Sequence, residues 1–359
     1  MTVDDMLRAM IERGASDIHL QAGSAPAIRV NGELKFQPGP PMKPRDTEMA
    51  ARHLLGDDRF EEFLYQNEMD FAYSLPGVAR FRCNVMRQRG AIGLALRVVP
   101  VYIPNFEELK LPRSAMEQIA NQERGLVIFT GPTGSGKSTS LAALLEFINQ
   151  NTARNIVTIE DPIEFLHRNK RSLVVQREVG LDTASYEEGL RFVLRQDPDV
   201  IMLGEIRDFD SMDAALTAAQ TGHLVLTTLH TLDAARTVTR MIDFFPLNQH
   251  EQVRLLLSES LIAIVSQRLL PSATGSGRVL AYELLLNTPL VREYIRDADK
   301  FGKLREAMSE GGAIGMHTFE QNLVELYSEG LITLEDAESA ATSANDLRLL
   351  LMRGMGKSF

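Results

Sequence analysis

Cysteine is nearly absent from this chain of 359 residues, because Cys83 is the only one. A single thiol excludes a disulfide framework and a four-cysteine zinc module within the chain. This composition is typical of a reducing compartment, and we expect a cytoplasmic protein. Residues 1–5 lack the basic and apolar regions of a secretory leader, so nothing there marks the chain for export.

Long apolar stretches and excess positive charge are also missing. The longest apolar window, residues 255–270, is interrupted by polar residues such as Glu259 and Arg268 and cannot span a bilayer. The net charge of −10 argues against a general nucleic-acid surface, which neutralises phosphates with Lys and Arg, although a local basic groove is compatible with it. We therefore expect no nucleic-acid partner, and membrane association only through partner proteins.

The pattern of expected elements changes near residue 113, which indicates two folded regions. Residues 1–99 mix amphipathic helices with antiparallel strand signals, including an Asn-Gly turn at residues 31–32, and predict an α+β domain. Residues 100–112 hold three prolines and few large apolar residues, so we expect an interdomain linker that acts as a hinge. Residues 113–287 predict an α/β core. Residues 288–359 predict a helical end, in which Thr318 and Gln321 are expected to form a capping box.

Alternation of strands and helices in the core predicts a mostly parallel sheet with helices on both faces. Strands are expected at residues 126–130, 155–160, 173–176, 199–203, 223–229 and 279–286. Helices are expected at residues 137–149, 185–195, 210–221, 233–242 and 248–268. Ligands of such a sheet bind beyond the carboxyl ends of its strands.

The residues between the first core strand and the first core helix fit the phosphate-loop pattern G-x-x-x-x-G-K-[ST] without a mismatch. They are Gly131, Pro132, Thr133, Gly134, Ser135, Gly136, Lys137 and Ser138, and Thr139 follows directly. The glycines let backbone N–H groups turn toward a polyphosphate, and the helix adds the positive end of its dipole. Lys137 is expected to reach the β- and γ-phosphates, and Ser138 to bind a bridging Mg²⁺. The flanking strand and helix make a chance match a poor explanation.

The apolar segment at residues 200–205 ends in a carboxylate, the layout of a Walker B element. Gly204 stands where an Asp would hold the magnesium indirectly. Glu205 is therefore predicted to orient and deprotonate the attacking water rather than to ligate metal. An exposed glutamate at a strand end is the alternative.

Two further clusters lie at predicted strand ends. Glu160, Asp161 and Glu164 place three carboxylates within five residues, so a compensating Mg²⁺ is expected nearby, while a solvated acidic turn is the alternative. We assign Glu164 to the metal site, and also to catalysis as the replacement candidate for the base. His223 and His230 bracket one strand, and His230 is placed to sense or stabilise a γ-phosphate.

The order of these four segments resembles that of the secretion ATPases, and within them the type IV pilus retraction ATPases (PilT and PilU), nearest to the PilU branch. The similarity runs from residues 16–20 to residues 345–348. It implies a PAS-like N-terminal domain, a RecA-like domain that hydrolyses ATP with Mg²⁺, and a homohexameric motor of pilus retraction and twitching motility. It also implies an inner-membrane pilus platform protein as partner, with a PilT-type paralogue as a second one, at the inner face of the cytoplasmic membrane.

The resemblance further implies that arginines of the N-terminal domain reach the nucleotide of a neighbouring subunit. Arg82 and Arg97 match the family positions best, and Arg113 is a weaker candidate; ordinary surface arginines are the alternative. Residues 290–297 match only partly a motif that PilT proteins require, so unaided retraction stays open.

Two other functions share parts of this pattern. A pilus-assembly or type II secretion ATPase typically carries a four-cysteine zinc module, which one cysteine cannot supply. A regulatory protein that binds nucleotide without turnover would lack the base or the sensor, yet Glu205 and His230 are both present.

Overall fold

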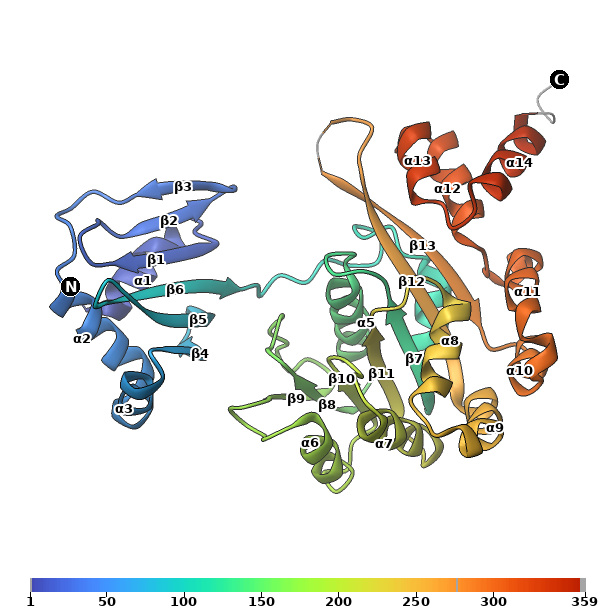
Figure 1. The fold of residues 1–359 in the computed structure, drawn as a ribbon, viewed down its shortest axis with the longest axis horizontal. Coiled ribbons are helices and arrows are strands. Elements are labelled where there is room, and N and C mark those ends of the chain that lie inside the picture. Colours follow the sequence, from blue (N-terminus) through green and yellow to red (C-terminus); the bar gives the residue numbers. More distant parts are fainter. Residues whose placement is uncertain (1, 276, 356–359) are drawn as a thin grey trace. The chain divides into compact units, whose positions relative to one another are not determined.

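The computed structural model describes residues 2–275 and 277–355, which form two compact units (Figure 1). The first unit comprises Met1–Tyr102 and Pro162–Leu166, and the second comprises Ile103–Asp161 and His167–Phe359. Phe106 and Leu111 are buried in the core of the second unit. The expectation that few apolar residues fix the segment 100–112 is therefore wrong for residues 103–112, which pack with the second unit.

The first unit is an antiparallel sheet with helices. Its strands are β1 (Asp17–Gln21), β2 (Ala27–Val30), β3 (Glu33–Phe36), β4 (Glu68–Leu75), β5 (Ala79–Gln88) and β6 (Ala91–Val99), in the order β3-β2-β1-β6-β5-β4. Its helices are α1 (Val3–Glu12), α2 (Pro44–Leu55) and α3 (Asp57–Gln66). Asn31 and Gly32 have φ of 51° and 85°, the left-handed pair that the tight β2–β3 turn requires, so the predicted hairpin is confirmed.

The second unit contains a mostly parallel sheet, as the alternating pattern predicts. Within the described residues its strands are β7 (Gly125–Thr130), β8 (Asn155–Glu160), β9 (Leu173–Glu178), β10 (Val200–Leu203), β11 (Leu224–Leu229), β12 (Leu261–Pro271) and β13 (Arg278–Leu286). Their order is β13-β12-β7-β11-β10-β8-β9, and only the β12–β13 pair is antiparallel. Every residue of β7 and β11 is buried, because helices cover both faces of the sheet.

Helices pack on the two faces of this sheet in separate groups. The helices are α4 (Arg113–Ala120), α5 (Lys137–Asn151), α6 (Tyr186–Val193), α7 (Phe209–Gln220), α8 (Ala234–Asp243) and α9 (His250–Ser260), with a short 3₁₀ turn, η1 (Leu247–Gln249). Apolar residues of α4 and α5 belong to one buried cluster, and those of α6 to α9 belong to another. The carboxyl edge of the sheet is thereby left to the loops.

The helix predicted at residues 248–268 is wrong over its second half. α9 ends at Ser260 and β12 begins at Leu261. β12 pairs with β7 on one side and β13 on the other, so its backbone groups find ladder partners that no helix could offer. A buried apolar run of this kind fits either structure by periodicity alone, and the β-branched Ile262, Ile264 and Val265 favour the strand.

The C-terminal part of the second unit is helical, as predicted. It contains α10 (Pro289–Arg296), η2 (Ala298–Lys303), α11 (Leu304–Glu310), η3 (Gly311–Ile314), α12 (Phe319–Ser328), α13 (Leu334–Ala340) and α14 (Ala344–Met355). The expected capping box is present at the start of α12, where the Thr318 N–H donates to Gln321 at 2.9 Å. Phe319 and Leu323 pack against Leu270 and Val279 of the β12–β13 hairpin. Among the described residues, no helix has the length and apolar content needed to cross a bilayer.

Candidate active site

The phosphate loop joins the carboxyl end of β7 to the start of α5. A Cβ atom at Gly131 would lie 2.3 Å from the carbonyl oxygen of Gln267, so only glycine fits there. The Lys137 ammonium donates to the carbonyls of Gly131 at 2.8 Å and Pro132 at 3.1 Å. A polyphosphate in this loop would take over these bonds from the lysine. The loop therefore already has its turn and its cation in place.

The neighbouring strand β12 supports the phosphate loop. Gln267 is fully buried, its carbonyl lies against Gly131, and its amide nitrogen donates to the Ser140 hydroxyl of α5 at 2.8 Å. The Leu269 side chain lies 3.6 Å from where a Cβ of Gly136 would be. Sequence patterns do not predict these contacts, because they favour a helix over residues 248–268.

Gly204 follows β10, and the aspartate of a generic Walker B element would fit there only if the Tyr186 side chain shifted. A Cβ here would lie 2.8 Å from the Tyr186 hydroxyl. The Gly204 N–H donates to the carbonyl of Ile159 at 2.8 Å, and its carbonyl accepts from the Thr228 hydroxyl at 2.7 Å. These bonds to the segments of β8 and β11 fix the backbone on which Glu205 is carried.

The Glu205 carboxylate lies between an arginine and a histidine. Its Oε2 is 3.0 Å from Arg207 Nη2, and its Oε1 is 3.1 Å from His230 Nε2. The hydrogen bond to Glu205 raises the pKa of Arg207. Glu205 and His230 come together because β10 and β11 are parallel neighbours that end at the same edge. Sequence reasoning missed Arg207, for which the only signal was its position two residues after the predicted base.

The predicted acidic cluster is divided between the two units. Glu160, at the end of β8, is buried and accepts from the Thr158 hydroxyl at 2.7 Å and the Gln176 amide at 3.0 Å. Asp161 belongs to the second unit, whereas Glu164 lies in Pro162–Leu166 of the first. Glu164 and the phosphate loop therefore belong to different units.

The residues around the phosphate loop fit a magnesium ion of the nucleotide-bound type. Residues 2–275 and 277–355 contain no group of three or more His, Cys, Asp or Glu side chains arranged to hold a metal. Mg²⁺ at phosphate sites needs few protein ligands, because water and phosphate oxygens complete its octahedron. The Ser138 hydroxyl, in the first turn of α5, has the oxygen chemistry and the place for such a ligand.

The two histidines lie at opposite ends of β11, so the prediction that they bracket one strand is confirmed. His223 precedes the strand, where its Nδ1 lies 2.9 Å from the carbonyl oxygen of Ala218 near the end of α7. Its own carbonyl accepts from the N–H of Gly125, the first residue of β7. The structure thus places His223 away from Glu205 and gives it a partner at a helix end.

Arg82 and Arg97 are cross-strand neighbours in the first unit. They are paired directly in the β5–β6 register. Arg97 donates to Asp17 at 2.8 Å while 72% of its side chain stays exposed. Burial raises the pKa of Asp17, but hydrogen bonds from Arg97 and Ser16 bring it below its usual value. Both arginines therefore lie on one face of the sheet.

Arg113, the weaker candidate, lies in the second unit on α4. Its Nε is 2.6 Å from Glu117, and its guanidinium also pairs with Glu107. Two carboxylates thus already neutralise this arginine.

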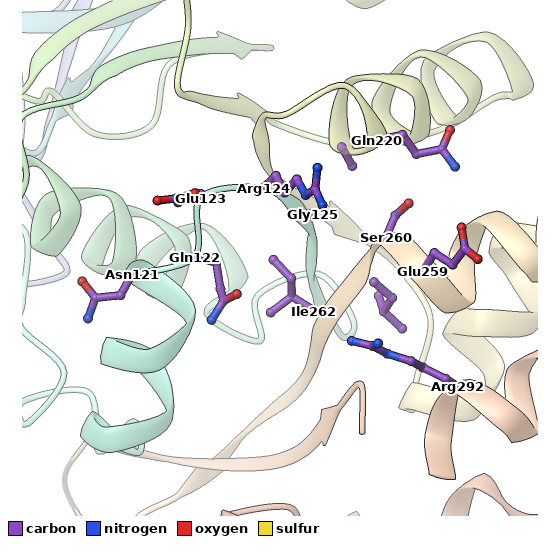
Figure 2. Close-up of a pocket in the computed structure, with 12 residues that line it drawn as sticks. Asn121, Gln122, Glu123, Arg124, Gly125, Gln220, Glu259, Ser260, Ile262 and Arg292 are labelled. Carbon is purple, nitrogen blue, oxygen red and sulfur yellow. The ribbon is translucent and has the colours of Figure 1, made fainter. Parts of the chain in front are cut away.

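A cavity of about 810 Å³ lies at the amino edge of the sheet, next to the first residues of β7 and β12 (Figure 2). Its lining mixes charges, with Arg124 and Arg292 beside Glu123 and Glu259. The phosphate loop, by contrast, follows the carboxyl end of β7. The cavity and the predicted chemistry therefore lie at opposite edges of one sheet.

A phosphate loop, a strand-end glutamate and a histidine at the carboxyl edge of a parallel sheet define a P-loop ATPase. Residues 1–313 match the family described as "Type II/IV secretion system protein". The "Type IV pilus ATPase PilU" of Pseudomonas aeruginosa is 44% identical, over 99% of this chain and 92% of its own length. The "Type IV pilus retractation ATPase PilT" of the same organism is also 44% identical, over 95% of this chain and 98% of its own length.

A solved structure agrees with these relatives. The crystal structure of "the Pilus Retraction Motor PilT and Bound ADP" has a TM-score of 0.89 and 45% identity, over 97% of this chain and 99% of that one. The chain belongs to the type II/IV secretion system family and, within it, to the PilT and PilU pilus retraction ATPases. It has the N-terminal domain and C-terminal ATPase domain of that family, and it is an ATPase.

Proposed function

We propose that the chain works as a homohexameric motor that hydrolyses ATP to drive or assist retraction of a type IV pilus. The observation that carries the proposal is the contact of 3.1 Å between the Glu205 carboxylate and His230. This contact lies at the edge of the sheet where the phosphate loop leads into α5. The relatives named for pilus retraction span nearly the whole chain, and one of them was solved with ADP. These similarities support ATP as the nucleotide.

The chain's own residues divide the chemical work among them. Lys137 and the loop N–H groups, from Gly131 through Thr139, hold the phosphates and spread their charge. Glu205 orients the attacking water and takes its proton, while His230 fixes the carboxylate and faces the γ-phosphate. Ser138, with Glu164 as a second candidate ligand, would hold a Mg²⁺ ion, which would neutralise charge on the phosphate oxygens.

Subunits of the ring complete each other's sites in this proposal. Arg82 and Arg97 belong to a unit without a nucleotide motif of its own, and Arg97 is largely exposed although it bonds Asp17. A trans arginine would stabilise the charge that develops on the phosphates. Subunits with Lys137→Ala mixed with subunits with Arg97→Ala should then recover part of the ATPase activity. No recovery in rings shown to be mixed would contradict the trans role.

The direction of work is tested in cells that assemble pili. Loss of a retraction motor leaves pili extended, so deletion of the gene should raise the number of surface pili and abolish twitching. Loss of pili would instead indicate an assembly ATPase.

ATPase rates measured alone and with a PilT-type paralogue would show whether the chain acts unaided. Capture of an inner-membrane platform protein would support attachment at the inner face of the membrane.

A further inference from the structure

Arg268, on strand β12, contacts three separate segments of the second unit. Its Nη2 donates to the carbonyl oxygen of Leu232 at 3.1 Å and to the Thr342 hydroxyl at 3.0 Å. Its Nη1 donates to the carbonyl of Ala340. Its Cζ atom lies 3.8 Å from the ring centroid of Phe319. One guanidinium thus joins the loop after β11 to the C-terminal helices.

Leu232 belongs to the loop of residues 230–233, here called the His230 loop. His230 begins this loop and contacts Glu205 at 3.1 Å. Asp233 ends the loop as the N-cap of α8, and its side chain accepts a hydrogen bond from the N–H of Arg236 at 2.7 Å. Arg268 holds the carbonyl between these two points, so its position bears directly on where the imidazole of His230 lies.

The other end of the contact is a firmly bonded part of the C-terminal helices. Ala340 and Thr342 lie where α13 ends and before α14 begins. The buried Glu320 accepts the N–H groups of Thr342 and Ser343, both at 2.8 Å, and pairs with Arg305 at 2.7 Å. A shift of α12 or α13 would therefore carry the acceptors of Arg268 with it.

The surroundings of Arg268 make these contacts costly to lose. Burial lowers its pKa, whereas the nearby Glu283, Glu320 and Asp233 raise it. The Arg268 guanidinium is half-buried, so losing its carbonyl and hydroxyl acceptors costs more than the loss of a fully exposed hydrogen bond. The guanidinium should therefore follow its acceptors when they move, and the Leu232 carbonyl should follow the guanidinium.

We propose that Arg268 is a positioning residue that couples the C-terminal helices to the His230 loop, so that displacement of residues 340–342 changes the rate of ATP hydrolysis. The inference rests on the proposed roles of His230 and Glu205. It makes the C-terminal helices, which contain no predicted site residue, the place where a bound partner could set the motor's speed.

The test uses the full chain with three single substitutions and one double. Arg268→Gln should lower kcat about tenfold, because it removes a charge-assisted hydrogen bond. The Kd for ADP should stay within about twofold of the wild-type value. Thr342→Val keeps the side-chain shape and should lower kcat about threefold. The double variant should be no slower than Arg268→Gln, because both changes act through one contact. The matched control is Arg348→Gln, which removes an exposed pair with Glu338 within the C-terminal helices and should leave kcat unchanged.

Hydrogen exchange provides a readout that needs no turnover. Thr342→Val should raise exchange at the amides of residues 230–234, whereas Arg348→Gln should not. Unchanged exchange there, or Arg268→Gln that folds and keeps the wild-type kcat, would overturn the coupling. If Arg268→Gln does not fold, Thr342→Val decides the matter by both measurements. If the wild-type chain shows no ATPase activity, the proposed function fails, and hydrogen exchange still supports or overturns the coupling.

Discussion

The two edges of the seven-stranded sheet carry similar side chains in opposite backbone settings. At the carboxyl edge, α5 and α8 begin at Lys137 and Ala234, so free N–H groups and positive dipole ends face the loops. At the amino edge, α4, α7 and α9 end beside the cavity at Ala120, Gln220 and Ser260, so carbonyl groups face outward. The first setting suits a phosphate and the second does not.

The histidines illustrate this difference. His230, at the carboxyl edge, contacts the carboxylate of Glu205, whereas His223, at the amino edge, contacts the carbonyl of Ala218. His223 is half-buried and His230 is exposed, and both lie beside the same strand. Their backbone surroundings, not their residue type, assign one to the proposed chemistry and the other to a helix end. The cavity at the amino edge does not reverse this assignment.

The largest contrast between the edges is expected at Lys137. Lys137→Ala removes the ammonium from the phosphates and should raise the Kd for ATP at least about 100-fold, with turnover lost. Arg124→Ala, at the amino-edge cavity, is the control and should leave the Kd unchanged. Calorimetric titration with ATP and Mg²⁺ checks both. Tight binding by the Lys137 variant would move the phosphate site elsewhere.

Glu205→Gln should stop hydrolysis while nucleotide binding remains. The amide keeps the shape of the side chain but cannot take a proton, so kcat should fall about 100- to 1,000-fold. Glu259→Gln, an amino-edge carboxylate, serves as the control and should retain kcat. Phosphate release and ADP titration measure the two quantities. Near-wild-type turnover by Glu205→Gln would make Glu164 the replacement candidate.

Glu283 provides a pH test of the carboxyl edge, where it accepts the first N–H of α8 at Ala234. Its pKa is raised from 4.5 to about 7, mainly by burial. The nearby Asp233 and Glu320 also raise this pKa, whereas the Ala234 N–H and Arg268 lower it. The folded state thus binds a proton that the unfolded state releases. The stabilisation of the folded state that comes from this proton is fully present below pH 4.5 and is lost as the pH rises through 7.

Relative to Glu283→Gln, whose amide does not titrate, the wild type should therefore lose on the order of 3 kcal/mol of unfolding free energy between about pH 4.5 and 8. Urea unfolding of both proteins across this range measures the difference. A pH-independent difference would show that Glu283 stays ionised in the folded chain.

The two histidines give the smallest predicted effect and the most direct comparison. His230→Gln should lower kcat about tenfold, because the Glu205 carboxylate loses one of its two partners. His223→Gln should lower thermal stability slightly and leave kcat unchanged. Steady-state kinetics with melting curves separate these outcomes. Equal losses of kcat would mean that the two edges are coupled through β11.

Contiguous patterns carried most of what could be predicted. The phosphate loop depends on neighbours within eight residues of each other, so its turn, glycines and helix start follow from local backbone rules. The Asn31-Gly32 hairpin and the capping box at Thr318 are local in the same sense, and both were confirmed. Alternating strands and helices also predicted a parallel sheet, because each connection must return to the same edge.

Contacts between distant segments were decided only by the tertiary structure. Residues 261–268 form a strand because β7 and β13 supply ladder partners, and an apolar run carries no record of such partners. Arg207 and Arg268 gained their contacts once β10, β11 and β12 took their places in the sheet. The physical reason is the range of the forces: backbone conformation is set by a few adjacent residues, whereas pairing, burial and charge contacts depend on which segments folding brings together.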